Sequence, residues 1–218
     1  MKWSPTRTSL RDIAYETIRK KIITCEMRPG QSLTVIELSD ALNIGRTPVI
    51  QAIDRLVVEG LIQVIPRKGI VVSPIRHDEL VDIIQMRIIN EVQAARWAAK
   101  KANNNDICNL NSNLIATKRA INNQDIEQFI LLDRKFHRII TNISGNRVLI
   151  DFLNNIQDKA LRLLFTSLRM PDHNLLVFNQ HSNIVEAIKA VDSDAAEAAM
   201  REHLASFESN AMRQIMPD

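Results

Sequence analysis

Apolar positions in the first third of the chain follow a helical period in three places and then change to the period of strands. The spacing predicts helices over 9–24, 35–42 and 47–59, separated by short turns that contain glycine or asparagine. Two β-branched runs follow at 61–65 and 70–72. This order predicts a helix-turn-helix unit followed by a two-stranded wing, a combination whose second helix typically enters the major groove of DNA.

The rest of the chain has a different pattern. Only one glycine lies beyond residue 72, and long stretches of Ala, Leu, Ile, Lys and Glu predict an almost entirely helical second domain. We therefore expect a mainly α protein. It has a winged helix-turn-helix domain over 1–72, a linker over 73–77 and an all-α helical bundle over 78–218.

Six helices are expected in the bundle, with a loop at 170–173 before the fifth of them. Asp106, Asp125 and Asp194 are the expected N-cap residues, because their carboxylates can accept from free backbone N–H groups. The six predicted helices span 78–103, 106–122, 125–144, 147–167, 178–191 and 194–215.

Composition and charge narrow the class of protein. The chain has 218 residues, of which 45% are hydrophobic and 24% charged, and no apolar run approaches the ~20 residues that span a membrane. Only two cysteines occur and the N-terminus lacks a signal-peptide core, so we expect a reducing, cytoplasmic location. Lys and Arg outnumber Asp and Glu by 12 to 7 over 1–76, whereas the counts are 16 and 18 over 77–218. Positive charge therefore coincides with the predicted DNA-binding unit, as phosphate neutralisation requires.

Polar residues of the predicted recognition helix and wing are the candidates for contact with double-stranded DNA. Arg46 opens the helix and suits bidentate bonding to guanine, although a phosphate contact fits the same position. Gln51 can pair with a base edge, and the wing tip is cationic. One recognition helix makes few contacts, so we expect a homodimer on a pseudo-palindromic operator. The expected DNA contacts are Arg46, Thr47, Gln51, Arg55, Arg67 and Lys68.

The second domain carries a candidate metal site. Three of the five histidines fall inside predicted helices, namely His137, His181 and His203. Asp133 precedes His137 by one helical turn, so the two side chains project from the same face. A bundle that places these helices around one cavity would offer a set suited to Zn²⁺, Ni²⁺ or Mn²⁺. Judged by spacing alone, Asp133 and His137 are more commonly a surface or capping pair than a pair of metal ligands.

Motifs in both predicted domains occur in the order of one known family. Residues 37–49 match a helix-turn-helix signature, and 56–61 with 67–69 match the end of a recognition helix and a wing. Matching motifs in the second domain are 87–91 with 98–99, 133–137, 144–146, 181, 194, 198 and 203–204. Together, over about 9–210, they resemble a GntR-family transcriptional regulator of the FadR-type branch. Its second domain is an FCD ligand-binding domain, and six helices are most similar to the VanR-type subgroup.

The resemblance implies a ligand-responsive regulator, most commonly a repressor and not an enzyme. It implies that the aspartate and three histidines named above bind a divalent metal that helps hold a small carboxylate effector. Arg87 can pair with a second carboxylate through its planar guanidinium, with an ion pair to Glu91 as the alternative. Arg162 is a further candidate for contact with the effector.

Two other functions stay open on the residues alone. The first is a small metalloenzyme acting on an organic acid, although no spare carboxylate is placed as a general base. The second is a DNA-binding dimer with no ligand, in which the histidines are structural.

The chain departs from the family pattern at three places in the first domain. Gly45 replaces a serine, so a hydroxyl that could cap the recognition helix is missing. Ile50 and Gln51 replace an arginine and a glutamate, which removes one cationic contact to DNA. Cys25 replaces a common glycine, and we expect from this that the turn after the first helix needs no positive φ.

Overall fold

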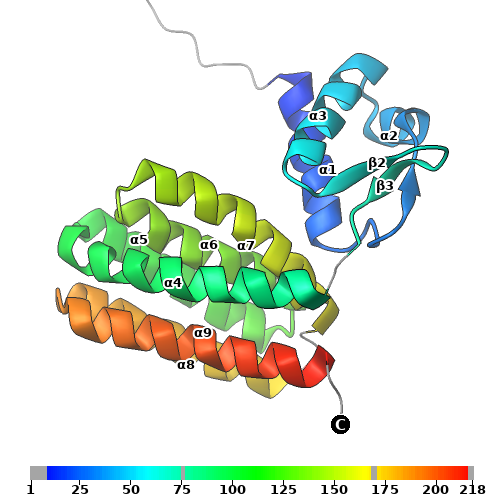
Figure 1. The fold of residues 1–218 in the computed structure, drawn as a ribbon. Helices are drawn as coiled ribbons and strands as arrows, with labels where there is room; N and C mark the ends of the chain where they lie inside the picture. Colours follow the sequence, from blue (N-terminus) through cyan, green and yellow to red (C-terminus); the bar gives the residue numbers. More distant parts are fainter. Residues whose placement is uncertain (1–8, 75–76, 168–170, 216–218) are drawn as a thin grey trace, which may run out of the picture. The chain divides into compact units, whose positions relative to one another are not determined.

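The computed structural model describes residues 9–74, 77–167 and 171–215, and it divides the chain into two compact units, 1–75 and 76–218 (Figure 1). The division falls within the predicted linker. Each unit has its own hydrophobic core, so each is described by itself. Among the described residues, no helix is long and apolar enough to cross a membrane. The predicted fold class, mainly α with a small winged unit, is confirmed.

The first unit is a three-helix arrangement closed by a small sheet. α1 packs against α3, and α2 lies beside α3. Ile18 and Ile22 of α1 share one buried core with Leu56 of α3 and with Leu61. The elements are α1 Leu10–Ile23, β1 Ser32–Leu33, α2 Val35–Leu42, α3 Arg46–Val58, β2 Ile62–Ile65 and β3 Gly69–Val72.

The sheet has one strand more than the sequence predicts. Its order is β1-β3-β2, and both pairings are antiparallel. β2 and β3 form the predicted wing, with Ile65 opposite Gly69 next to the turn. β1 pairs Leu33 with Ile70. This strand has only two residues, which is too few to show an alternating hydrophobic pattern in the sequence.

Local interactions define both ends of α2 and the start of α3. The Thr34 side chain accepts from the backbone N–H of Glu37, and the Glu37 carboxylate accepts from that of Thr34. Asn43 ends α2 in the left-handed region at φ 52°, which asparagine tolerates well. α3 begins behind Gly45 with no side-chain cap, as the missing hydroxyl predicts.

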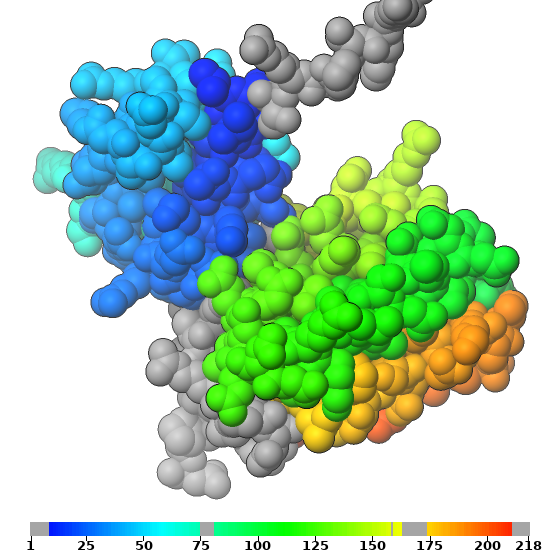
Figure 2. Space-filling view, turned by 180° about the vertical axis from the view of Figure 1, so that it is seen from behind, coloured from blue at the N-terminus to red at the C-terminus, as the bar shows by residue number. Residues whose placement is uncertain are grey.

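The second unit contains the six predicted helices. In Figure 1, α4 lies in front, with α7 above it and α9 below it, and α4 packs against both. From the opposite side, Figure 2 shows α5 crossing the far face, where it packs against α8. The helices are α4 His77–Lys101, α5 Asn104–Asn122, α6 Ile126–Ile143, α7 Arg147–Ser167, α8 Pro171–Lys189 and α9 Ser193–Ile215.

Several predicted helix starts in this unit are wrong. α8 begins at Pro171, so 171–173 are helical and not a loop, while residue 170 lies outside the described residues. Asn103 caps α5, and Asp106 is the third residue inside that helix. The Asp192 carboxylate accepts from the N–H groups of Asp194 and Ala195, so Asp194 is not the cap. Asp125 caps α6 as predicted, by accepting from the N–H of Gln128.

The turn after α1 also differs from the expectation. Cys25 has a φ of 56°, in the left-handed region, so the replacement of glycine does not mean that positive φ is avoided. An L-residue other than glycine pays roughly 1–2 kcal/mol for this conformation. Strain is therefore present at this position of the first unit.

Replacing Cys25 by glycine is expected to stabilise the first unit by about 0.5–1 kcal/mol, because relief of the left-handed strain exceeds the added chain entropy. Cys108→Gly is the matched control, since Cys108 is exposed inside α5. That change is expected to destabilise the second unit by about 0.5–1 kcal/mol. Native-state hydrogen exchange measures the free energy of opening of each unit. Destabilisation by both changes would contradict the prediction.

Candidate functional site

Four potential metal ligands meet inside the helical unit, and we call them the Asp–His cluster. Asp133 and His137 come from α6, His181 from α8 and His203 from α9. One ligand atom from each lies within 4.8 Å of the others, and all four residues are buried. The structure therefore brings together every residue that the sequence analysis named as a metal ligand.

The spacing of these atoms suits a small divalent cation. Nε2 of His203 lies 3.2 Å from Nε2 of His137 and 3.4 Å from Nε2 of His181. Oδ1 of Asp133 lies 3.5 Å from Nε2 of His181 and 3.9 Å from Nε2 of His137. A tetrahedral site with metal–nitrogen bonds near 2.05 Å has ligand atoms about 3.3 Å apart. The donor set and its spacing fit such an ion.

Two of the cluster's imidazoles have a side-chain partner at Nδ1, the ring nitrogen that does not face the other ligand atoms. Nδ1 of His137 lies 2.5 Å from Oε2 of Glu91, although off the line of an ideal hydrogen bond. Nδ1 of His203 lies 3.1 Å from Oε1 of Gln180. Such partners fix ring orientation in metal sites and leave Nε2 facing the ion. Sequence analysis assigned neither residue this role.

Glu91 connects the cluster to Arg87. Nε of Arg87 donates to Oε1 of Glu91 at 2.6 Å, and both residues are buried on α4. Burial alone raises the pKa of Glu91, but Arg87 and His137 outweigh it and hold that pKa well below its usual range. Glu91 is therefore a carboxylate at neutral pH. Arg87 forms the ion pair that was the alternative to an effector contact.

The surroundings of His181 favour the neutral form of its imidazole. Its ring stacks on Phe136, with centroids 3.8 Å apart and planes 10° apart. Burial, followed by the nearby His203 and His137, lowers the pKa of His181 well below its ordinary value. A neutral imidazole binds a metal without first losing a proton.

The predicted DNA contacts are distributed over α3 and the wing. Arg46, Thr47 and Gln51 are exposed on the N-terminal half of α3, away from its buried side. Arg67 and Lys68 are exposed at the tip between β2 and β3. A helix of this length and a hairpin tip are the elements that winged units place against a duplex.

Arg55 has contacts within the protein. Its guanidinium lies 3.6 Å from the centroid of the Tyr15 ring, and its Nε donates to Oε1 of Glu59. The Tyr15 hydroxyl donates to the same carboxylate at 2.7 Å. Arg55 thus ties α3 to α1, and its role as a phosphate contact stays a prediction.

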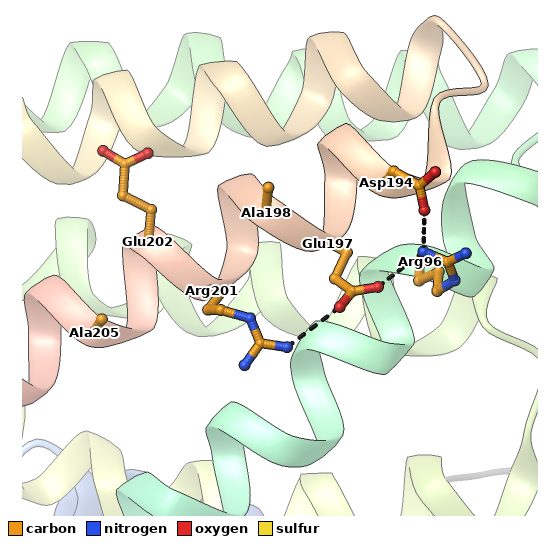
Figure 3. A pocket seen from close by; sticks show the side chains of 7 residues that line it. All are labelled: Arg96, Asp194, Glu197, Ala198, Arg201, Glu202 and Ala205. Atoms are coloured by element: carbon orange, nitrogen blue, oxygen red, sulfur yellow. Dashed lines mark hydrogen bonds and ion pairs between the residues drawn. The ribbon is translucent and has the colours of Figure 1, made fainter.

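A shallow groove of about 640 Å³ lies on the surface between α4 and α9 (Figure 3). Arg96 of α4 pairs there with Asp194 and Glu197 of α9, and Arg201 also bonds Glu197. Arg201 is exposed, whereas His203, two positions along the same helix, is buried in the Asp–His cluster. The groove is thus a charged outer surface and not the interior site.

Both units match known protein families. The model described as "Bacterial regulatory proteins, gntR family" matches residues 10–72, and the FCD domain model matches 82–206. The HTH-type transcriptional repressor RspR of Escherichia coli strain K12 is 30% identical over 201 residues, covering 92% of this chain and 88% of RspR. The HTH-type transcriptional repressor NanR of Cronobacter sakazakii is 27% identical over 221 residues, covering 92% and 84%.

Solved structures share the fold along nearly the whole chain. E. coli McbR/YncC has a TM-score of 0.87 at 21% identity, covering 96% of this chain and all of that one. A putative GntR regulator from Rhodococcus sp. RHA1 has a TM-score of 0.81 at 16% identity, covering 93% and 97%.

A winged helix-turn-helix joined to a helical FCD domain defines a DNA-binding transcriptional regulator. The chain belongs to the GntR family, and its second domain is an FCD domain. The resemblance seen in the sequence is thereby confirmed. Members of this family are regulators and not enzymes, which removes the metalloenzyme alternative.

Proposed function

We propose that the protein is a cytoplasmic, metal-dependent repressor whose FCD domain binds a small carboxylate effector and whose homodimer binds a pseudo-palindromic operator. The observation that carries this proposal is the convergence of four buried ligand atoms in a domain joined to a DNA-binding unit. Two relatives named as transcriptional repressors support the direction of regulation. Effector binding releases the operator if the effector binds the DNA-free form more tightly.

The Asp–His cluster is the proposed metal site. Three imidazoles and one carboxylate are a suitable donor set for Zn²⁺, Ni²⁺ or Mn²⁺. One carboxylate leaves the site with net positive charge. When bound, the metal supplies open coordination positions that an acid can fill.

The rest of the effector is proposed to contact arginine. Nε of Arg87 is held by Glu91, so an effector carboxylate would approach the edge formed by its two Nη groups. Arg162 is also buried, on α7, and this helix packs against both α4 and α6. Buried guanidinium groups suit planar, bidentate binding of carboxylates.

His137→Ala is expected to abolish metal binding, because it removes a ligand from the centre of the cluster. Protein purified without chelator or nickel resin should carry about one metal ion per chain, and the variant should carry none by elemental analysis. Glu91→Gln keeps all four ligands but removes the charge behind His137. Its metal affinity should fall roughly 10- to 100-fold in a chelator competition.

The matched control for metal binding is His77→Ala, at the first residue of α4, about four helical turns before Glu91 on the same helix. This variant should retain its metal. If wild-type protein carries no metal and takes up none, the proposal is wrong and a DNA-binding dimer without metal remains.

Arg46 and Lys68 are expected to affect DNA binding in different ways. Arg46→Ala should cost about 1–3 kcal/mol and relax the preference at one base pair, because a bidentate guanine contact is lost. Lys68→Ala should weaken binding to all sequences and reduce the slope of log affinity against log salt by about one. Fluorescence anisotropy on duplexes selected by the wild-type protein measures both. Arg119→Ala, exposed on α5, should change neither quantity.

Exposed apolar side chains indicate where a second copy of the chain would bind. Met86 and Ile89 of α4 are 39% and 66% exposed, and Val148 and Phe152 of α7 are 81% and 38% exposed. We call this the α4–α7 face, since the two helices pack side by side (Figure 1). Beyond α4 lies the charged groove shown in Figure 3. An apolar centre beside a charged rim is typical of protein interfaces.

Aspartate on the α4–α7 face should convert a dimer to monomers. Ile89→Asp and Val148→Asp each place a charge where the second copy would bury a hydrocarbon side chain. Ile115→Asp is the matched control, because Ile115 is 57% exposed on α5, away from this face. Light scattering after size-exclusion chromatography measures the mass. Dissociation by the α5 variant alone would place the interface elsewhere.

A further inference from the structure

The outward side of α3 presents a large apolar side chain, Ile50, that the core of the first unit does not use. The buried side of this helix consists of Val49, Ala52, Ile53 and Leu56, which all belong to that core. Ile50 lies outside this set and is 45% exposed. A single exposed hydrophobic residue is ordinary on a protein surface, so the meaning of Ile50 depends on its neighbours.

The neighbours of Ile50 form the surface that a winged unit turns toward a duplex. Residues three and four apart on a helix lie side by side, so Ile50 is next to Arg46, Thr47 and Asp54. These three residues and Gln51 are exposed. Because the opposite side of α3 is buried, this surface is the one that a helix-turn-helix of the GntR family can place in the major groove. Ile50 is therefore placed among the residues expected to meet base edges.

No cation of α3 occupies the same place. Arg46 and Arg55 are the only cationic residues of this helix. The Arg55 guanidinium lies 3.6 Å from the centroid of the Tyr15 ring, and its Nε donates to the Glu59 carboxylate. Arg55 is thus directed toward α1, and Arg46 lies one turn before Ile50. The middle of the outward surface has a hydrocarbon side chain where the family pattern has an arginine.

The chemistry of the major groove selects one base for such a side chain. Guanine, adenine and cytosine present only hydrogen-bonding groups there, whereas thymine also presents its C5-methyl group. An isoleucine placed against the first three displaces water from donors or acceptors and offers no hydrogen bond in return. Against thymine, two hydrocarbon groups leave water together, which is favourable. Thymine is therefore the base that fits Ile50.

We propose that Ile50 recognises a thymine in each operator half-site by packing against its C5-methyl group. An arginine at this position would suit guanine instead. The operator of this protein should then differ at that base pair from operators of relatives that carry the arginine. This inference rests on the proposed binding of an operator through α3, and it makes Ile50 a residue that determines specificity.

Replacement of thymine by deoxyuridine tests the inference, because deoxyuridine lacks only the methyl group and still pairs with adenine. The full-length protein and duplexes selected by it are used, and affinity is measured by fluorescence anisotropy. Each thymine is replaced in turn, at the equivalent positions of both half-sites at once. At one position the wild-type protein should bind about 10- to 20-fold more weakly, which corresponds to about fourfold for each methyl group.

The Ile50→Ala variant should bind the thymine and deoxyuridine duplexes with affinities that differ by about twofold or less, because most of the contacting hydrocarbon is gone. The ratio of the two affinities cancels any effect of the substitution on the protein alone. Val58→Ala is the matched control. Val58 is 88% exposed on α3 but lies at its C-terminal end, away from the end of a recognition helix that contacts bases. This variant should keep the full effect of deoxyuridine.

Three results would overturn the inference. If wild-type protein binds its selected duplexes and no deoxyuridine weakens binding, methyl recognition is rejected and operator binding stands. If Ile50→Ala keeps the deoxyuridine effect and Thr47→Ser loses it, the methyl group of Thr47 is the one that reads thymine. If wild-type protein selects no sequence at all, the proposed operator binding fails and this inference fails with it.

Discussion

The interior of the FCD domain depends on one buried negative charge, the carboxylate of Glu91. A carboxylate that is 1% exposed is unfavourable unless other charges and donors surround it. Arg87 supplies one such charge, and the His137 imidazole lies against the other oxygen. Arg87 also lies over the ring of Phe207 on α9, 5.4 Å from its centroid. Because an apolar replacement for a buried ion pair is often as stable, stability alone does not explain these residues. Glu91 also lies against His137 of the Asp–His cluster, and the proposed metal site would account for both residues.

Much of the fold was predictable because it is encoded locally. Hydrophobic period and turn residues identify the helices and the wing, since each helix buries one face and each turn needs particular residues. The errors arise where one residue suits two positions. An aspartate near a helix start serves either as the N-cap or as the third helical residue, which is why Asp106 was mistaken for the cap in place of Asn103. Pro171 marks a first helical position, a signal that the loop prediction overlooked.

Of the candidate site, only the four potential metal ligands were predictable from the sequence. Histidines inside amphipathic helices stand out in a sequence, and the Asp133–His137 spacing puts two of the four side chains on one face. The partners behind them do not stand out, because tertiary packing selects them. Gln180 looks like any helical glutamine until the helices around it are placed. Glu91 is intermediate, since its spacing from Arg87 suggests an ion pair but gives no reason to expect His137 beside it.

The contacts that link Arg87 through Glu91 to His137 also limit how the proposed effector and metal can act on each other. An acid that binds Arg87 adds negative charge beside Glu91, and this strengthens the field that favours a cation at His137. Metal and acid should then bind cooperatively, and by thermodynamic reciprocity each raises the affinity of the other by the same factor. The same rule governs the DNA-binding unit. An effector that lowers operator affinity must itself bind more weakly to the DNA-bound form, by a factor that is typically about 5- to 150-fold. Under the proposed function, acid, metal and operator would be three linked ligands, and the affinity measured for any one would depend on the occupancy of the other two.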